Sequence, residues 1–294
     1  PGPETSPSPD EVRLRLTVLA RKLAEHGEAK LIVNLSYACN NRCSFCSVGD
    51  RPRCHGDYEV QLAEIRAARA RGIRLLDLDG GEPTLYPRLF ELLAAVAPLG
   101  MTRTTVTTNG RRLAYRAFAR RLAATGVQVL ISFHGSKAEV HERLTGSPGS
   151  YQQTLLGLRH ALVAFREVGV NTTLVEGNLD DLPALADLLA RLGVRRWTIQ
   201  SLTPVGTAGL EHVPDPERTR ARLREVVARH GDALNISIIG LPYCELPGLE
   251  PRVLDDHHKM ARDMLFVDGT RVNLGAYLAE RRYHVPERCD PCVY

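Results

Sequence analysis

The chain has no long apolar run and no apolar segment near its start. It comprises 294 residues, 44% of them hydrophobic, yet no stretch approaches the ~18 consecutive apolar residues of a membrane span. The Pro- and Ser-containing start, Pro1 to Pro9, resembles neither a signal peptide nor an anchor. The sequence therefore predicts no membrane partner, and its length permits one large core or two smaller ones.

Lysine is rare, so the positive charge of the chain comes mainly from arginine. Only Lys22, Lys30, Lys137 and Lys259 stand among the 38 basic residues, and the arginines are spread along expected helices. Although the formal net charge is +4, this spread favours solvated helix faces over a nucleic-acid footprint. We do not expect nucleic acid as a partner.

The seven cysteines lack the secretory context in which a disulfide framework forms. They indicate metal or catalytic thiols and a cytoplasmic, reducing location. Three of them, Cys39-x3-Cys43-x2-Cys46, directly follow an apolar run at residues 31–38. The loop lacks a fourth cysteine, whereas structural zinc sites and closed electron-transfer clusters normally have four ligands. Three thiolates fit a four-iron cluster with one open iron, and a zinc knuckle is the alternative.

Short apolar runs alternate with amphipathic stretches over most of the chain. This alternation predicts a parallel sheet in an α/β fold, and six strands are too few for a closed eight-stranded barrel. A helix at residues 10–26 precedes it; a helix at 214–230, a strand at 234–239 and a hairpin at 265–273 follow. The expected strands cover residues 31–38, 74–79, 103–108, 127–133, 170–175 and 196–202, and the expected helices between them residues 57–71, 86–97, 113–125, 150–168 and 181–192. Glycines such as Gly72 and Gly169 are expected to end these helices.

The cysteine triplet, with Phe45 before its last member, resembles the signature of the radical S-adenosylmethionine (radical SAM) superfamily. The resemblance implies a partial (β/α)6 TIM-like barrel with a 4Fe-4S cluster on Cys39, Cys43 and Cys46. It also implies S-adenosylmethionine (SAM) on the open iron, reductive formation of a 5′-deoxyadenosyl radical, and hydrogen abstraction from a substrate.

Three further motifs follow expected strands and resemble SAM-binding segments of that family. Gly80-Gly81-Glu82-Pro83 is similar to the motif that holds the SAM amino group, Asn109 lies in a Thr-Asn-Gly segment, and Ser132 stands where a serine reaches the ribose or carboxylate. Glycine permits close backbone approach to a ligand. His134 replaces an aspartate common in the family, which leaves the catalytic acid or base unassigned.

The remaining thiols predict a second metal site near the C-terminus. Cys244 and Cys289-x2-Cys292 surround the expected hairpin, and the arrangement resembles the auxiliary-cluster domain called twitch or a shortened SPASM domain. A zinc knuckle is the alternative. The fourth ligand could come from substrate, from Asp290 or His284, or from residues beyond Tyr294.

These expectations divide the chain into a tail and helix (residues 1–30), a radical SAM partial barrel (31–210), and a linker helix with a β-hairpin/α auxiliary iron-sulfur domain (211–294). We take the first segment as too short for a leader-peptide module. The expected function is oxidative modification of a peptide or small molecule, with flavodoxin or ferredoxin as the electron donor. The alternatives are a radical SAM isomerase or epimerase and a non-catalytic zinc or iron-sulfur module.

Overall fold

A computed structural model describes residues 29–254 and 262–274, together with residues 13, 17 and 276. The expected N-terminal helix at residues 10–26 falls outside these residues, apart from two positions. In the described part of the chain, no helix is long and apolar enough to cross a membrane.

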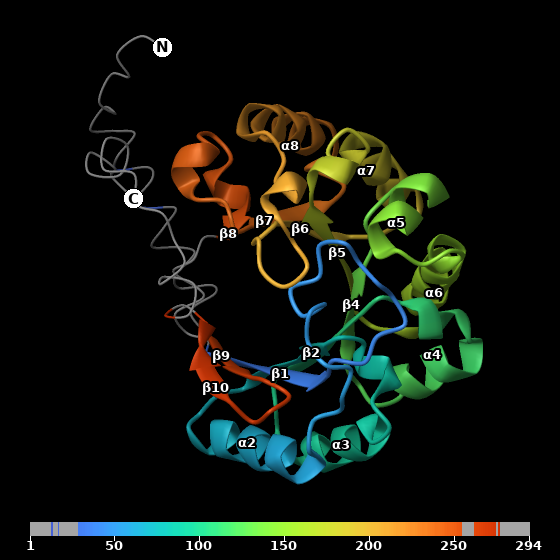
Figure 1. Ribbon diagram of the computed structural model, residues 1–294, viewed down its shortest axis with the longest axis vertical. Helices are drawn as coiled ribbons and strands as arrows, with labels where there is room; N and C mark the ends of the chain where they lie inside the picture. Colours follow the sequence, from blue (N-terminus) through green and yellow to red (C-terminus); the bar gives the residue numbers. More distant parts are fainter. Residues whose placement is uncertain (1–12, 14–16, 18–28, 255–261, 275, 277–294) are drawn as a thin grey trace.

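The centre of the molecule is a ten-stranded sheet in the order β10-β9-β1-β2-β3-β4-β5-β6-β7-β8. All neighbouring strands are parallel except β9 and β10, which form an antiparallel hairpin. The sheet curls so that its two edges come to the same side of the molecule (Figure 1). The strands are β1 (Lys30–Ser36), β2 (Leu75–Gly80), β3 (Arg103–Thr108), β4 (Gln128–Ser132), β5 (Val168–Leu174), β6 (Arg196–Ser201), β7 (Asn235–Ile239), β8 (Val253–Leu254), β9 (Arg262–Leu265) and β10 (Arg271–Asn273).

Helices cover the convex face of this sheet (Figure 1). Several begin where the sequence supplies a cap: Asp57 accepts a hydrogen bond from Val60 N at 2.9 Å at the start of α2, and Asp215 does the same at α8. The helices are α2 (Tyr58–Ala70), α3 (Leu89–Val96), α4 (Arg116–Ala123), α5 (Ala138–Thr145), α6 (Ser150–Ala164), α7 (Leu182–Arg191) and α8 (Pro216–His230), and short 3-10 helices cover Pro83–Leu85, Ala97–Leu99, Arg111–Ala114, Glu176–Asn178, Leu210–His212, Tyr243–Glu245 and Glu250–Arg252.

The core lies between the sheet and these helices. Alternate strand residues such as Leu31, Val33 and Leu35 are fully buried in it, because successive side chains of a strand point to opposite faces. The same alternation turns polar side chains to the concave face.

The six expected strands are all present with shifts of a few residues at their ends, and the α/β half-barrel is confirmed. One further helix, α5 (Ala138–Thr145), lies where no element was expected from the sequence. One local expectation is wrong. Gly169 does not cap α6 but pairs with Leu130 inside β5, where its ideal Cβ position lies 2.9 Å from Leu130 Cδ1.

The described part of residues 211–294 does not form a sheet of its own. The expected strand there, β7, pairs with β6, and the expected hairpin, β9–β10, docks on β1 through parallel pairing. The hydrophobic side chain of Leu265 joins the same core as β1. The sheet therefore continues on both sides of the six expected strands.

Candidate active site

The three cysteines of the triplet lie in the loop between β1 and α2, at the carboxyl edge of the sheet. Their side chains are partly buried. Burial, with smaller contributions from neighbouring thiols and, for Cys39, from Glu82, raises the pKa of the Cys39 thiol to about 11 and that of Cys43 to about 12. Burial also raises the pKa of Cys46.

These three soft sulfur donors suit an iron-sulfur cluster. Among the described residues, no three His, Cys, Asp or Glu side chains converge on one metal-ion position. A cluster does not need such convergence, because its cysteines bind different irons. The donor set fits the implied 4Fe-4S cluster.

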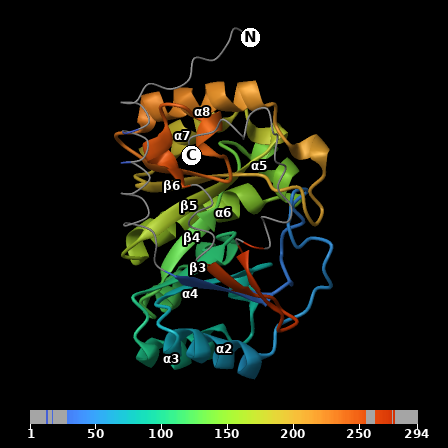
Figure 2. The ribbon, with the colours of Figure 1, turned by 90° about the vertical axis from the view of Figure 1, so that its left-hand side faces the viewer.

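Contacts from distant segments hold the cluster loop. Arg42 N donates to Thr145 O at 2.8 Å and Ser44 N to Leu144 O at 3.0 Å, both at the end of α5. Thr207, after β6, accepts from Cys46 N through its hydroxyl at 3.1 Å and donates its own N–H to Cys46 O at 3.0 Å. Figure 2 shows the loop after β1 and the segment after β6 at the same side of the molecule.

The Gly80-Gly81-Glu82-Pro83 segment packs directly on the start of the cluster loop. Gly81 N donates to Ser36 O at 2.6 Å, and Glu82 N to Ala38 O at 2.9 Å. An ideal Cβ on Gly81 would lie 2.6 Å from Ala38 O, so only glycine permits this approach. Pro83 begins a 3-10 helix.

Glu82 is a fully buried carboxylate that joins two of the expected motifs. Its Oε1 accepts from Thr84 N at 3.0 Å, from the Thr84 hydroxyl at 2.5 Å and from the Thr108 hydroxyl at 2.6 Å. Its Oε2 accepts from Asn109 N at 2.7 Å. Burial raises the pKa of this carboxyl, and the four donors oppose that shift. Both oxygens of Glu82 are thus engaged by the protein itself.

Asn109 reaches the cluster loop from β3. Its Nδ2 donates to Asn40 Oδ1 at 2.6 Å and lies 3.9 Å from Cys39 Sγ. Arg111, two residues on, donates to Asn41 Oδ1 at 2.9 Å and to the carbonyl of Asn40. The sequence pattern did not predict roles for Arg111 and Thr207; the position of Arg111 one residue after the Thr-Asn-Gly segment was the available signal.

Phe45 packs against His134, which follows Ser132 by two residues. The Phe45 ring meets the His134 ring edge-on, with centroids 4.9 Å apart, and half-buried Ser132 is the last residue of β4. His134 Nδ1 accepts from Thr173 N at 3.3 Å. Burial, with a further contribution from His141, lowers the pKa of His134 to about 3. His134 is therefore a neutral, packed imidazole beneath the cluster loop.

The structure places one of the three C-terminal thiols. Cys244 is exposed on the short helix Tyr243–Glu245, which follows the carboxyl end of β7. Since β7 is parallel to β1 through the intervening strands, Cys244 lies at the same edge of the sheet as the cluster loop. Cys289 and Cys292 lie outside the described residues.

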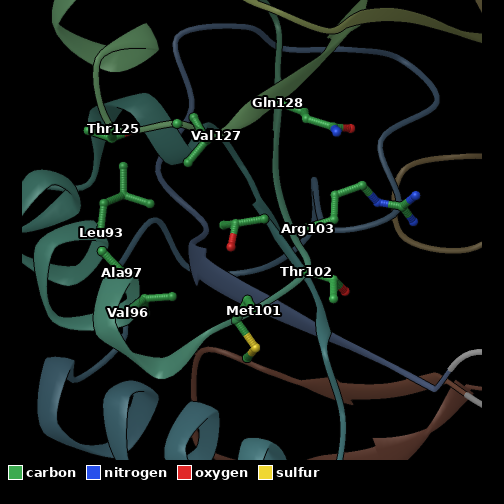
Figure 3. Close-up of a pocket in the computed structure, with 11 residues that line it drawn as sticks. Leu93, Val96, Ala97, Met101, Thr102, Arg103, Thr125, Val127 and Gln128 are labelled. Carbon is green, nitrogen blue, oxygen red and sulfur yellow. The ribbon is translucent and has the colours of Figure 1, made fainter.

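A cavity of about 200 Å³ lies at the other edge of the sheet. Figure 3 shows its apolar lining from Leu93, Val96 and Val127, while Arg103 and Gln128 point away from that lining. The cavity lies at the amino-terminal starts of β3 and β4. It is therefore not part of the site built around the cluster loop.

Comparison with known proteins identifies the family to which this geometry corresponds. The family model described as the radical SAM superfamily matches residues 33–197, more than half of the chain. A probable GTP 3′,8-cyclase of Thermococcus kodakarensis is 32% identical over 179 residues, which cover 59% of this chain and 57% of that protein. An AdoMet-dependent heme synthase of Methanosarcina barkeri is 31% identical over 178 residues, covering 58% of this chain and 50% of that one. The chain thus spans about half the length of the curated relatives it matches.

Two solved structures share the fold at low sequence identity. Streptococcus suis SuiB bound to S-adenosylmethionine superposes with a TM-score of 0.71 at 18% identity, over 93% of this chain and 67% of SuiB. The FeFe-hydrogenase maturase HydG of Carboxydothermus hydrogenoformans gives a TM-score of 0.57 at 18% identity, over 85% of this chain and 63% of HydG.

Proposed function

Because this chain belongs to the radical SAM superfamily and is an enzyme of that kind, we propose that it abstracts a hydrogen atom from a peptide or small-molecule substrate in an oxidative, biosynthetic modification. The family uses a 4Fe-4S cluster and SAM. When bound, these groups together supply the 5′-deoxyadenosyl radical. The observation that carries the proposal is the packing of the start of the cluster loop at one edge of the sheet, where Ala38 lies against Gly81 and Cys39 lies near Asn109.

The residues of this chain have separate roles in the proposal. Cys39, Cys43 and Cys46 hold the cluster, and the backbone around Gly80 and Gly81 receives the methionyl part of SAM. Ser132 faces the ribose or carboxylate, and Phe45 lies against the bound cofactor. Glu82 orients Asn109 rather than contacting SAM, since protein donors occupy both of its oxygens.

Relatives with different reactions support either a small molecule or a peptide as the substrate. One relative is named for GTP, and SuiB has been solved with a precursor peptide. We propose flavodoxin or ferredoxin as the electron donor and a reducing, cytoplasmic compartment, where the exposed thiol of Cys54 stays reduced.

Replacing Cys39, Cys43 and Cys46 together by alanine tests the proposed function. After anaerobic reconstitution, the wild type should form 5′-deoxyadenosine, one for one with oxidised product once a substrate is supplied. The triple variant should form none, because it lacks the ligands of the radical-generating cluster. Cys54→Ala is the matched control, since Cys54 lies in the same loop but is exposed. Undiminished 5′-deoxyadenosine in the triple variant would refute the assignment.

We further propose that Cys244, Cys289 and Cys292 bind an auxiliary iron-sulfur cluster. The support is the position of Cys244 at the same edge of the sheet as the cluster loop. Reconstituted wild type should then contain about eight irons, and about four after these three cysteines are changed to alanine, at four irons per cubane cluster. Stoichiometric zinc with unchanged iron would instead indicate a zinc knuckle.

A further inference from the structure

Three basic residues form one transverse row at the amino-terminal ends of neighbouring strands. Lys30 pairs in register with Arg262 on β9 and with Leu75 on β2, and Leu75 pairs with Arg103 on β3. Residues paired across a sheet point to the same face. The next residue along β1, Leu31, is fully buried in the core under the helices, so this row faces the concave side.

Two carboxylates, Asp77 and Asp79, share this face with the three cations, because alternate residues of β2 point to the same side. Asp77 lies two residues after Leu75 on β2 and accepts a hydrogen bond from Lys30 Nζ at 2.7 Å. The side chain of Asp77 is only 19% exposed and that of Lys30 only 16%. Asp77 and Arg103 both act electrostatically on Lys30 and on Arg262, and Lys30 and Asp77 act on Asp79, so these five charges lie close enough to interact. Within residues 29–254 and 262–274, neither Arg103 nor Arg262 has a carboxylate within 4.0 Å. Among the described residues, three cations therefore face two carboxylates, which leaves one positive charge in excess.

The group also retains an unused acceptor. Asp77 Oδ1 is buried and receives no hydrogen bond from the described residues. An excess positive charge on a partly buried face is costly without an anion, and a buried acceptor is costly without a donor. A ligand that carries an anionic group beside a hydroxyl or N–H donor would satisfy both.

Polar groups continue the row along the sheet. Gln128 on β4 points to the same side as Arg103 (Figure 3), and Arg196 on β6 reaches Gln128 Oε1 at 3.4 Å. Arg196 also pairs with Glu167 at 3.0 Å and is 48% exposed, so its charge is largely balanced. In the part of the chain that the structure describes, the cations of the row without a carboxylate within 4.0 Å are Arg103 and Arg262.

We propose that Arg262, Lys30 and Arg103, with Asp77, form a subsite that holds a phosphate or carboxylate group of the substrate. The row lies six residues before Ser36 on β1, roughly 20 Å from the cluster-loop edge at ~3.3 Å per residue. The substrate is therefore elongated, with its anionic end at this row and its reacting end toward the cluster loop. The guanidinium group of an arginine can bind either a phosphate or a carboxylate through two parallel hydrogen bonds. The statement that the bound molecule is a substrate rests on the proposed function. Anion binding at this subsite can be tested without it.

Titration calorimetry with two probes tests the subsite and separates the two anion sources. Inorganic pyrophosphate represents a phosphorylated metabolite, and the tripeptide Glu-Glu-Glu represents an acidic peptide segment. We expect at least one probe to bind the wild type in a salt-dependent manner. Arg103→Gln and Arg262→Gln should each weaken that binding at least about tenfold, as loss of a charge-assisted contact does. Lys30 is not replaced in this test, because its removal would leave the Asp77 carboxylate without its ion-pair partner.

Arg271→Gln is the matched control. Arg271 is on the same hairpin as Arg262, but it pairs in register with the core residue Leu265 and contacts Glu64 at 3.3 Å. Its replacement should leave probe binding unchanged. Failure of both probes to bind, or equal binding by wild type and the two arginine variants, would overturn the subsite. Formation of 5′-deoxyadenosine is measured alongside; if it is absent while probe binding behaves as expected, the proposed function fails and the subsite stands.

Discussion

At the scale of single residues, the candidate site depends on a carboxylate that contacts only protein. Glu82 accepts hydrogen bonds from two backbone N–H groups, Thr84 N at Oε1 and Asn109 N at Oε2. It also accepts hydrogen bonds from two threonine hydroxyls. Hydroxyls can reorient, but backbone N–H groups are fixed donors. The position thus requires an acceptor at both oxygens, which only a carboxylate supplies.

We expect Glu82→Gln to destabilise the protein by about 1–3 kcal/mol, the cost of one buried donor without an acceptor. Whichever way the new amide is turned, its NH2 group faces one of the two backbone N–H donors. The loop at Asn109 should loosen and SAM affinity should fall, as measured by thermal unfolding and by SAM binding to the reconstituted protein.

Glu91→Gln provides the comparison for that variant. Glu91 is 55% exposed and pairs with Arg88 on the surface, so its replacement should have little effect. Equal stability and SAM affinity in Glu82→Gln and the wild type would show that Glu82 is not needed to hold the Asn109 loop.

At the scale of elements, the decisive contact is the close approach of the carboxyl ends of the paired strands β1 and β2. Gly80 has φ +127° and an ideal Cβ position 2.3 Å from Ser36 O, and the ideal Cβ of Gly81 lies 2.9 Å from Tyr37 O. Strand, cluster loop and turn are therefore in backbone contact. A side chain at either glycine must displace the loop that carries the cysteines.

We expect Gly81→Ala to reduce both stability, by about 1–3 kcal/mol from overpacking, and the iron content of the reconstituted protein. Gly72→Ala is a control for destabilisation alone: Gly72 has φ +91° but no atom within 4 Å of its ideal Cβ. It should cost about 1–2 kcal/mol through the left-handed backbone and leave iron content unchanged. Full iron content in Gly81→Ala would argue that the contact does not position the cluster loop.

At the scale of the whole molecule, the pairing of β9 with β1 joins the late part of the chain to the barrel. Leu265 on β9 is 2% exposed and lies in the same core as Leu31 and Val33. A shared core predicts one cooperative unfolding transition rather than separate transitions for two domains.

We expect Leu265→Ala to lower the free energy of unfolding by about 2–5 kcal/mol. Trp197 is the sole tryptophan and is fully buried on β6, far from β9 in the strand order, so its fluorescence reports on the barrel. Its denaturation midpoint should shift together with the far-UV circular dichroism. Val163→Ala, at a side chain that is 84% exposed on α6, should leave both within about 0.5 kcal/mol. An unchanged Trp197 midpoint in Leu265→Ala would indicate an independent second domain.

The sequence by itself determined the features that depend on neighbours along the chain. The spacing of Cys39, Cys43 and Cys46, the alternation of apolar runs with amphipathic helices, and the glycine turn at Gly80 and Gly81 are local patterns. They were sufficient to predict the fold class and the family, and they place the candidate site at the carboxyl edge of the sheet.

Only the tertiary structure decided the features that join distant segments. Glu82 meets Asn109 across 27 residues, and Arg111 reaches Asn41 across 70, while the row of Arg262, Lys30 and Arg103 exists only through strand register. Strand order and register are set by the burial of whole faces and by pairing partners far along the chain. No local pattern specifies them, and for that reason the placement of β9 on β1 and the basic row could not be predicted from the sequence.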